Sequence, residues 1–333
     1  MKKAIFVWLL IIPLCYSCTK MWEDLDFDYG NSDTIHNPFG EEDDFELWQE
    51  RVLPIVEGCT TDYEKARAIF EWECANIAYD VDFKIYHAYE CWEQRKGVCQ
   101  AYSELFVKLA YGCDLEAVLL SGKARTSNNL EGEAGHAWVK VHTEKGWMLC
   151  DPTWGAGAVS MDHTEFYFNE YNMSMSWFDA DPEIVVFTHF PKNSEDQFLN
   201  VPITADQYRH LPDISAAVVP AGWKAHDVLD YFLSHPGESA PTFYGTFYDY
   251  LGKFELIQVP YNGKMRVGET YVLKIRSLAL EEGVSIGSWG TNNSEGWEQD
   301  GDLFTLVYTP ESEGELHISL DGYGGIMKYE VVN

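Results

Sequence analysis

Basic residues are scarce in this 333-residue chain, where 23 Lys and Arg face 54 Asp and Glu and the formal net charge is −31. A surface that binds nucleic acid must be basic enough to replace the counterions of the phosphates, so we expect no nucleic-acid partner. An anionic membrane surface would also repel the chain. We interpret the acidic excess as a source of solubility, with attraction of a cationic substrate as the alternative.

Motifs for cofactors and structural metals are also missing. Beyond the N-terminal leader there is no Cys-x-x-Cys pair, which argues against a structural zinc site. The sequence contains neither a glycine-rich phosphate loop nor an EF-hand pattern. We therefore expect no cofactor and no metal. The apolar content of 46% is enough for a sizeable core.

The N-terminus predicts export. Two lysines precede the apolar run Ala4–Leu14, which is too short to span a bilayer and has the pattern of a signal peptide. Ser17 before Cys18 resembles a bacterial lipobox, so we predict a signal peptide over 1–17 and lipidation of Cys18, with plain secretion as the alternative. Thr19 follows in place of Asp, which favours the outer membrane, with the lipid as the sole membrane contact.

The rest of the chain divides into a linker and two folded parts. Residues 18–43 are acidic and turn-rich, which predicts a tether behind the lipid. We place a catalytic domain over 44–212 and a mostly β domain over 213–333. An exported protein can form disulfides, but the pairing of the six cysteines beyond the leader cannot be read from the sequence. The sequence does not determine the oligomeric state.

Helical patterns precede strand patterns in the first part. Apolar residues recur at helical spacing after Phe45, a capping box at Thr61-x-x-Glu64 opens a second helix, and a third helix begins near Cys99 and ends at Gly112. Strand patterns follow at 116–120, 136–141 and 147–150, with a turn at 143–146. This order predicts an α+β fold in which helices pack on an antiparallel sheet.

The pattern changes after this region. Residues 182–212 mix short apolar runs with proline and are predicted to be coil and turns, and a helix is predicted over 223–233. From about 253 five strand patterns are separated by turn residues: FELIQV, TYVLKIRS, FTLVYT, ELHISL and MKYEVV. We expect a small all-β sandwich, with an immunoglobulin-like fold as one form of it.

Cys99 is the candidate nucleophile. It begins a predicted helix, where the positive end of the helix dipole and the nearby Arg95 and Lys96 favour the reactive thiolate. Gly97 allows the backbone to turn into the helix. The alternative is a buried, inert cysteine.

His136 and Asp151 belong to opposite strands of the predicted hairpin, at the end away from its turn, so they can be neighbours in space. A carboxylate beside an imidazole fixes the tautomer, while the other ring nitrogen faces the nucleophile. Taken alone, His136 would be interpreted as an ordinary core or surface residue, and Asp151 would be interpreted as part of an Asp-Pro turn. The combination with Cys99 predicts a catalytic triad.

Three segments resemble the transglutaminase-like cysteine enzymes: RKGVCQAYSELFVKLA at 95–110, GHAWVKV at 135–141 and WMLCDPTWGAG at 147–157. The resemblance runs from about 60 to 205. It includes the segment at 76–80 ahead of Cys99 and the segments at 181–183 and 188–191 behind Asp151, and this last part looks like the kyphoscoliosis-peptidase branch. The tail, Asp196-Gln197-Phe198-Leu199, departs from the usual Trp before Gln-Leu-Leu, which bears on the branch and not on the chemistry.

The resemblance implies that Cys99 is the nucleophile, His136 the general base and acid, and Asp151 the orienting carboxylate. Attack on a peptide or isopeptide amide would give a thioester, which water or an amine would resolve. The backbone N–H of Cys99 is one expected oxyanion donor. Weaker candidates for the oxyanion site or cleft are Gln100, Tyr79, Trp138 and Trp154, and no role is expected for His142, His163 or His189.

Two alternatives remain at this point. The fold could serve as a catalytically silent module that binds protein or peptide at the cell envelope, although an intact triad argues against this. Cys99, His136 and Asp151 could instead hold zinc, but a cysteine at a helix start fits a nucleophile better. The sequence does not distinguish hydrolysis from crosslinking or identify the substrate, and an acidic surface alone is no sign of a calcium requirement.

Overall fold

The computed structural model describes residues 45–125, 133–160, 164–291, 296–321 and 323–333. The predicted signal peptide, the tether and Cys18 lie outside the described residues, and so does His163. Within the described ranges no helix is both long and apolar enough to cross a membrane. Contacts divide the described chain into two compact units, one ending at Pro202 and one running from Ile203 to Asn333.

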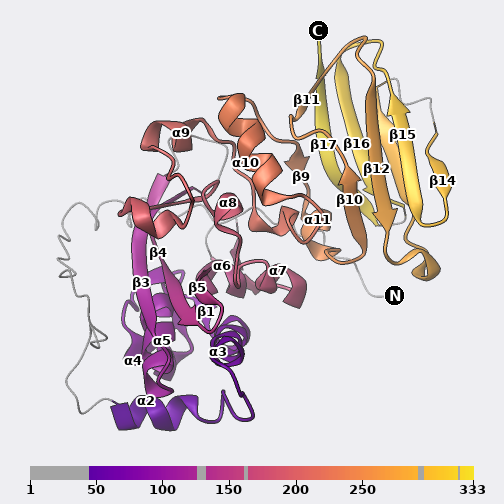
Figure 1. Ribbon diagram of the computed structural model, residues 1–333. Coiled ribbons are helices and arrows are strands. Elements are labelled where there is room, and N and C mark those ends of the chain that lie inside the picture. The colour runs from indigo at the N-terminus through magenta and orange to yellow at the C-terminus, as the bar shows by residue number, and fades with distance from the viewer. Residues whose placement is uncertain (1–44, 126–132, 161–163, 292–295, 322) are drawn as a thin grey trace. The chain divides into compact units, whose positions relative to one another are not determined.

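One central helix organises the first unit. This helix, α5 (Cys99–Gly112), contacts α2 (Phe45–Val52), α3 (Asp62–Asn76), α4 (Ala88–Gln94) and two strands of the main sheet (Figure 1). All residues of α5 except Tyr111 are buried. Its final glycine is required by packing, because a Cβ on Gly112 would lie 2.4 Å from the carbonyl carbon of Trp48 in α2. The predicted position of this helix is confirmed.

The start of α3 shows why the local sequence is a reliable guide there. The Thr61 hydroxyl accepts the Glu64 N–H at 3.1 Å, and the Glu64 carboxylate accepts the Thr61 N–H at 3.2 Å. This reciprocal pair satisfies two backbone donors that the first helical turn leaves free. The predicted capping box is therefore confirmed.

The main sheet is antiparallel, as predicted, and has the strand order β5-β4-β3-β8. Its strands are β3 (Ala117–Arg125), β4 (Glu133–Thr143), β5 (Gly146–Cys150) and β8 (His189–Pro191). The smaller elements of this unit are β1 (Ala78–Tyr79), β2 (Lys96–Gly97), α6 (Pro152–Ala156), β6 (Gly157–Val159), β7 (Phe166–Phe168), α7 (Tyr171–Met175), α8 (Pro182–Val185) and η2 (Ser194–Gln197). The first unit is thus an α+β fold with helices against an antiparallel sheet.

The prediction of coil and turns over 182–212 is wrong in part. The region contains α8, β8, η2 and α9 (Ala205–His210). The three residues of β8 are too few to show an alternating pattern, and their pairing with β3 is a contact between distant parts of the chain. This strand is the element that local periodicity missed, and it carries a residue of the candidate site.

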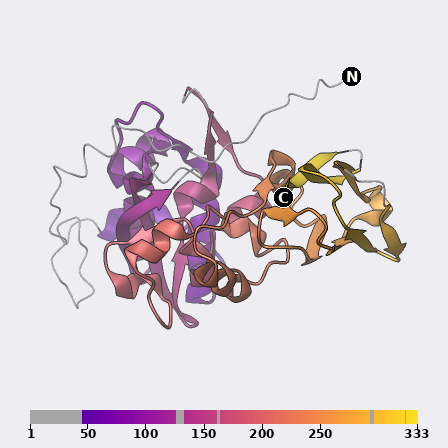
Figure 2. The same ribbon diagram turned by 90° about the horizontal axis from the view of Figure 1, so that it is seen from above.

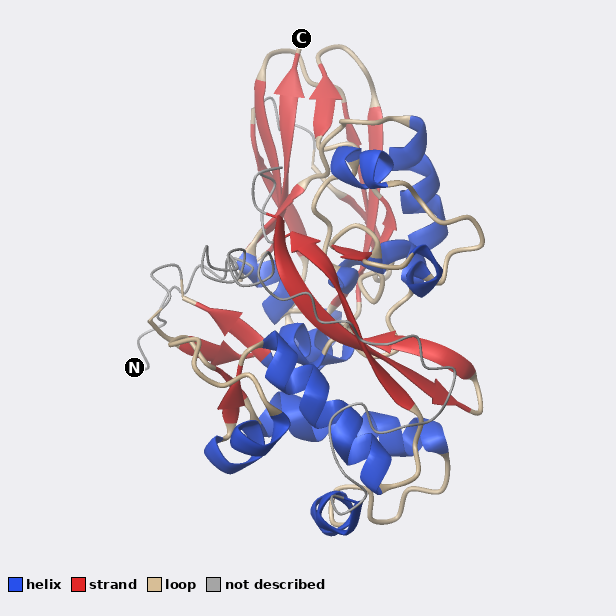
Figure 3. Ribbon diagram, turned by 90° about the vertical axis from the view of Figure 1, so that its left-hand side faces the viewer, coloured by secondary structure: helices blue, strands red, loops and turns tan. Residues whose placement is uncertain are grey.

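The second unit is rich in strands, which are drawn as yellow and orange arrows in Figures 1 and 2. In Figure 3 they are among the red arrows, since all strands are red there. One sheet has the order β10-β12-β15-β14, and the other has the order β11-β17-β16-β13 with β9 paired to β17. The elements are η3 (Ala216–Val218), α10 (Ala225–Ser234), β9 (Thr242–Phe243), α11 (Gly245–Asp249), β10 (Phe254–Gln258), β11 (Lys264–Arg266), β12 (Tyr271–Ser277), η4 (Leu280–Glu282), β13 (Ile286–Gly290), β14 (Glu298–Asp300), β15 (Leu303–Tyr308), β16 (Gly314–Leu320) and β17 (Gly324–Val332). All five predicted strands are present, and the immunoglobulin-like form stays a prediction.

Candidate active site

Cys99 is the first residue of α5 and is 3% exposed. Val98 precedes it in an extended conformation and donates its N–H to the carbonyl of Ile85 at 3.0 Å. The N–H groups of a first helical turn have no partner within the helix, so those of Cys99 and Gln100 lie at the positive end of α5. The backbone N–H groups of Cys99 and Gln100 are therefore available as donors at the start of α5, next to the thiol.

The two cations that precede Cys99 are engaged by other groups. Lys96 Nζ lies 3.2 Å from Asp80 Oδ1. The Arg95 guanidinium stacks on two indoles, 4.7 Å from the ring centroid of Trp72 and 4.3 Å from that of Trp92. These contacts do not support the expectation that both charges act on the thiol. The helix terminus and His136 are the features that remain for that role.

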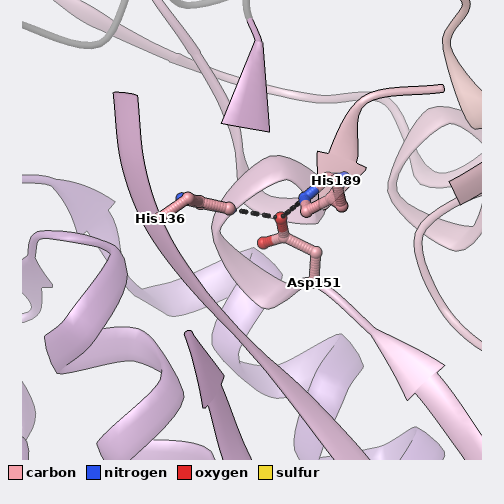
Figure 4. Close-up of side chains that lie close together, drawn as sticks. All are labelled: His136, Asp151 and His189. Carbon is pink, nitrogen blue, oxygen red and sulfur yellow. Dashed lines mark hydrogen bonds and ion pairs between the residues drawn. The ribbon is translucent and has the colours of Figure 1, made fainter. Parts of the chain in front are cut away.

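His136 and Asp151 form a buried pair. His136 lies within β4, opposite Gly122 of β3, and its Nε2 is 2.7 Å from Asp151 Oδ2 (Figure 4). Asp151 follows β5 and caps α6, where its Oδ1 accepts the N–H of Trp154 at 2.9 Å. The proline after Asp151 occupies the first helical position, which suits its missing N–H. The predicted proximity of His136 and Asp151 is therefore observed, and the Asp-Pro step is a helix cap.

A second histidine bonds the same carboxylate oxygen. His189 Nε2 lies 3.0 Å from Asp151 Oδ2 (Figure 4). His189 Nδ1 lies 2.8 Å from the hydroxyl oxygen of Thr188. The ring comes from β8, which reaches the site by pairing with β3. Sequence reasoning assigned no role to His189. The available signal was its place in the 188–191 segment of the family resemblance, because periodicity gave none.

The carboxylate determines where the ring protons lie. An ionised carboxylate can only accept hydrogen bonds, so both Nε2 atoms that face Asp151 Oδ2 must carry a proton. In a neutral His136, Nδ1 is then the unprotonated nitrogen and can accept a proton. Asp151 therefore fixes His136 in the tautomer that a general base needs.

Burial and charge act in opposite directions on this pair. Burial alone lowers the pKa of His136, but the charge and hydrogen bond of Asp151, together with the proximity and charge of Cys99, raise it to about 10. Burial by itself raises the pKa of Asp151, and the two histidines overcome this effect and hold it well below its usual value. Burial lowers the pKa of His189 below the ordinary histidine value. The site thus combines a basic His136, an ionised Asp151 and a neutral His189.

Cys99 influences the His136 ring as well. His136 Nδ1 is buried, and no described residue forms an ordinary hydrogen bond with it. The thiol nevertheless raises the pKa of His136, which requires that it lie close to the ring. We interpret this as a contact that is longer or less aligned than an ordinary hydrogen bond, as is common for catalytic groups without substrate.

Indole rings enclose the two histidines. Trp154 and Trp138 are 5% and 2% exposed, and their ring centroids lie 5.5 and 6.0 Å from that of His136. The centroid of Trp177 lies 5.5 Å from that of His189. The two tryptophans predicted to line the cleft are therefore packed around the histidine rings, where they keep water from the hydrogen bonds to Asp151.

The weaker candidates have other contacts. Gln100 is buried, and its Nε2 donates to Glu104 Oε1 at 2.9 Å, one helical turn along α5. Tyr79 is buried in β1, with its ring centroid 6.0 Å from that of Phe83. His142, for which no role was expected, is exposed and packs its ring edge against Trp147.

His136, Asp151 and His189 are also the described residues compact enough to be considered for a metal ion, with ligand atoms within 4.8 Å of one another. Two imidazoles and a carboxylate are suitable donors for zinc. Here both Nε2 atoms point at one carboxylate oxygen at hydrogen-bond distance, and a ring nitrogen that donates a proton cannot also bind a metal. Hydrogen bonding therefore accounts for the arrangement, and the set differs from the predicted alternative because it contains His189 in place of Cys99.

Residues 49–152 match the model of the transglutaminase-like superfamily, so this part of the chain is a transglutaminase-like domain. The predicted resemblance is confirmed over that stretch. It includes Cys99, His136 and Asp151, whereas His189 lies beyond it.

Relatives of known name cover part of the chain. Kyphoscoliosis peptidase of Mus musculus is 29% identical over 174 residues, which are 48% of this chain and 26% of that protein. Hillarin of Drosophila melanogaster is 23% identical over 193 residues, which are 51% of this chain and 23% of that protein. A solved structure of a candidate cysteine protease from Cytophaga hutchinsonii has a TM-score of 0.31 and 21% identity, and the match covers 41% of this chain and 45% of that one. The chain thus spans about a quarter of the length of these curated relatives.

Proposed function

We propose that the transglutaminase-like domain is a cysteine hydrolase or acyl transferase that acts on peptide or isopeptide amides. The observation that carries this proposal is the orientation of His136. Its Nε2 is hydrogen-bonded to Asp151 at 2.7 Å, which leaves Nδ1 free to take up a proton, and the influence of Cys99 on the pKa of His136 supports Cys99 as its source. A thiol, an imidazole of defined tautomer and a buried carboxylate are the parts that activate a cysteine nucleophile.

The chemistry can be written with these groups alone. His136 Nδ1 takes the Cys99 proton and keeps it, because the pKa of His136 is about 10, and the resulting thiolate attacks the amide carbonyl. The backbone N–H of Cys99, at the start of α5, is suited to stabilise the oxyanion. His136 then gives the proton to the departing amine, and a thioester remains on Cys99. In hydrolysis water attacks the thioester and an acid is released, whereas in transamidation an amine attacks it and a new amide is formed. In both cases His136 takes the proton of the attacking group, the carbon–sulfur bond breaks, and the Cys99 thiolate is restored.

We further propose that the protein is exported and anchored at the outer membrane through a lipid on Cys18. The leader and lipobox pattern at 1–18 support this. Metabolic labelling with palmitate, in the full chain and in Cys18→Ala, tests it. Label on the full chain that disappears in the variant is expected, and an unlabelled full chain would contradict the anchor.

The first test of the enzymatic proposal is the pH dependence of Cys99 alkylation by a small reagent, read by peptide mass spectrometry. Rapid modification well below the ordinary thiol pKa of about 8.5 is expected, and His136→Ala should slow it. His142→Ala is the matched control, because His142 lies on the same strand and is exposed. Burial raises the pKa of the Cys59 thiol, so Cys59 should react only under alkaline conditions and serves as the internal reference.

Two outcomes would contradict the proposal. A Cys99 thiol that reacts only near 8.5, or not at all, and that is indifferent to His136, would favour a silent binding module. Tight binding of zinc that depends on Cys99 would favour the metal-site alternative, and elemental analysis of the purified protein measures it.

A further inference from the structure

His189 is a buried histidine whose position is defined on every side. It is 1% exposed, and the centroids of Trp154 and Trp138 lie 4.5 and 5.0 Å from that of its ring. Its two nitrogens have separate partners, Asp151 on Nε2 and Thr188 on Nδ1. Both ring nitrogens are therefore satisfied, as buried polar groups usually are, and the bond to Asp151 connects His189 directly to the His136–Asp151 pair.

The hydrogen bonds form a continuous chain that ends near the thiol. In a neutral His189, Nε2–H donates to Asp151 Oδ2 and Nδ1 accepts from the Thr188 hydroxyl. Asp151 Oδ2 in turn accepts from His136 Nε2–H. The Thr188 hydroxyl oxygen also lies 3.2 Å from the carbonyl of Val185, which is the longer of its two contacts. The shorter contact of 2.8 Å to His189 fits donation to the ring.

We infer that His189 is a positioning residue of this site. Its Nε2–H donates to the same oxygen of Asp151 as His136 does. This second hydrogen bond holds the carboxylate in place and reduces the negative charge that Asp151 directs at His136. This inference rests on the proposed function. The physical reason is that two donors on one carboxylate oxygen share its negative charge, and each bond weakens the other. His189 lies outside the 49–152 family match, and its strand is held to the sheet by β3.

The other groups that face Asp151 do not supply this effect. They are the main-chain N–H of Trp154, which bonds the other oxygen, and the thiols of Cys74 and Cys150. Burial raises the pKa of both thiols well above the ordinary value, so both are neutral. His189 is therefore the second donor on the oxygen that His136 uses.

Two variants separate donation from space filling. His189→Gln can place an amide N–H near the Nε2 position and so keep the donor to Asp151. His189→Asn is shorter and loses that donor while it keeps a polar group near Thr188. The readout is the NMR titration of the His136 ring, together with its Nε2–H resonance. We expect His189→Asn to raise the pKa of His136 by about one unit and to move the resonance downfield, whereas His189→Gln keeps the wild-type values.

The inference would be overturned if the pKa of His136 were the same in wild type, His189→Asn and His189→Gln. It would also be overturned if both variants shifted this pKa by the same amount. Should His189→Asn fail to fold, Thr188→Val removes the donor to Nδ1 at similar volume, and a smaller upward shift is expected. An unchanged His136 would then overturn the inference. Cys99 alkylation is measured in parallel: an inert wild-type thiol would refute the proposed function, while the His136 titration still decides the role of His189.

Discussion

Replacing Asp151 by Asn tests the site because it removes the charge and leaves the helix cap. Asn is a good N-cap, so its carbonyl oxygen can still accept the Trp154 N–H that Asp151 Oδ1 accepts at 2.9 Å. The amide NH₂ then faces the two ring nitrogens, His136 Nε2 and His189 Nε2, which are both donors in the wild type. Donors would face donors, so both rings must move their proton to Nδ1. His136 would then present an N–H to Cys99 and could not act as its base.

The size of the effect follows from the pKa of His136. A rise from the ordinary 6.5 to about 10 corresponds to roughly 5 kcal/mol of preference for the charged ring. Without the carboxylate, burial is the dominant remaining influence, and it lowers the pKa of a histidine. We therefore expect the His136 pKa to fall below 6.5 in Asp151→Asn. The wrong tautomer should reduce Cys99 alkylation at neutral pH by about 10- to 30-fold, because a thiol with the ordinary pKa of about 8.5 is still roughly 3% ionised there.

The assay combines NMR titration of the His136 ring with the alkylation rate of Cys99 in the same samples. Asp181→Asn is the matched control, because Asp181 also caps a short helix that begins with proline and accepts the Glu183 N–H at 2.9 Å. The control should leave His136 and Cys99 unchanged. A His136 pKa that stays near its wild-type value in Asp151→Asn would refute the charge argument, and an unchanged alkylation rate would refute the assignment of the tautomer.

Three further predictions concern stability. Folding raises the pKa of His136 from 6.5 to about 10, so the charged ring stabilises the folded state fully below pH 6.5, and this contribution is lost as the pH rises through about 10. The melting temperature should therefore fall between these pH values, and it should fall less in His136→Gln. Glu73 is fully buried, neither carboxyl oxygen has a hydrogen-bond partner among the described residues, and burial raises its pKa well above 4.5. Glu73→Met should therefore stabilise the protein by about 1–3 kcal/mol at pH 7 in urea unfolding, with a smaller gain below pH 4.5, and a loss at both pH values would contradict the reasoning. A Cβ on Gly122 would lie 2.3 Å from the Phe190 carbonyl oxygen, so Gly122→Ala should separate β8 from β3, lower the melting temperature and disturb the His136 resonance, whereas Gly296→Ala meets no atom within 4 Å and should do neither.

Much of the fold could be predicted because the interactions that specify it are local. The capping box at Thr61 and the apolar stripe of α5 depend on residues three and four positions apart. The alternation that marks β4 and β5 has a period of two, and their turn lies between them in the sequence. Hairpin geometry alone was enough to predict that His136 and Asp151 are neighbours, and their Nε2–Oδ2 distance is 2.7 Å.

The remaining features depend on contacts between distant parts of the chain. Arg95 and Lys96 stand next to Cys99 in the sequence, yet Trp72 and Asp80 bind them, because side chains respond to the nearest partner in space. The strand β8 is too short to carry a periodic signal and exists through its pairing with β3.

The sequence by itself determined the helices α3 and α5, the hairpin and the order of Cys99, His136 and Asp151, since short-range periodicity and capping specify them. Only the tertiary structure brought His189 to Asp151, from 38 residues away, and enclosed the pair in tryptophan rings. The physical reason is that a buried carboxylate takes donors from whichever element packing delivers, and no local pattern records that choice.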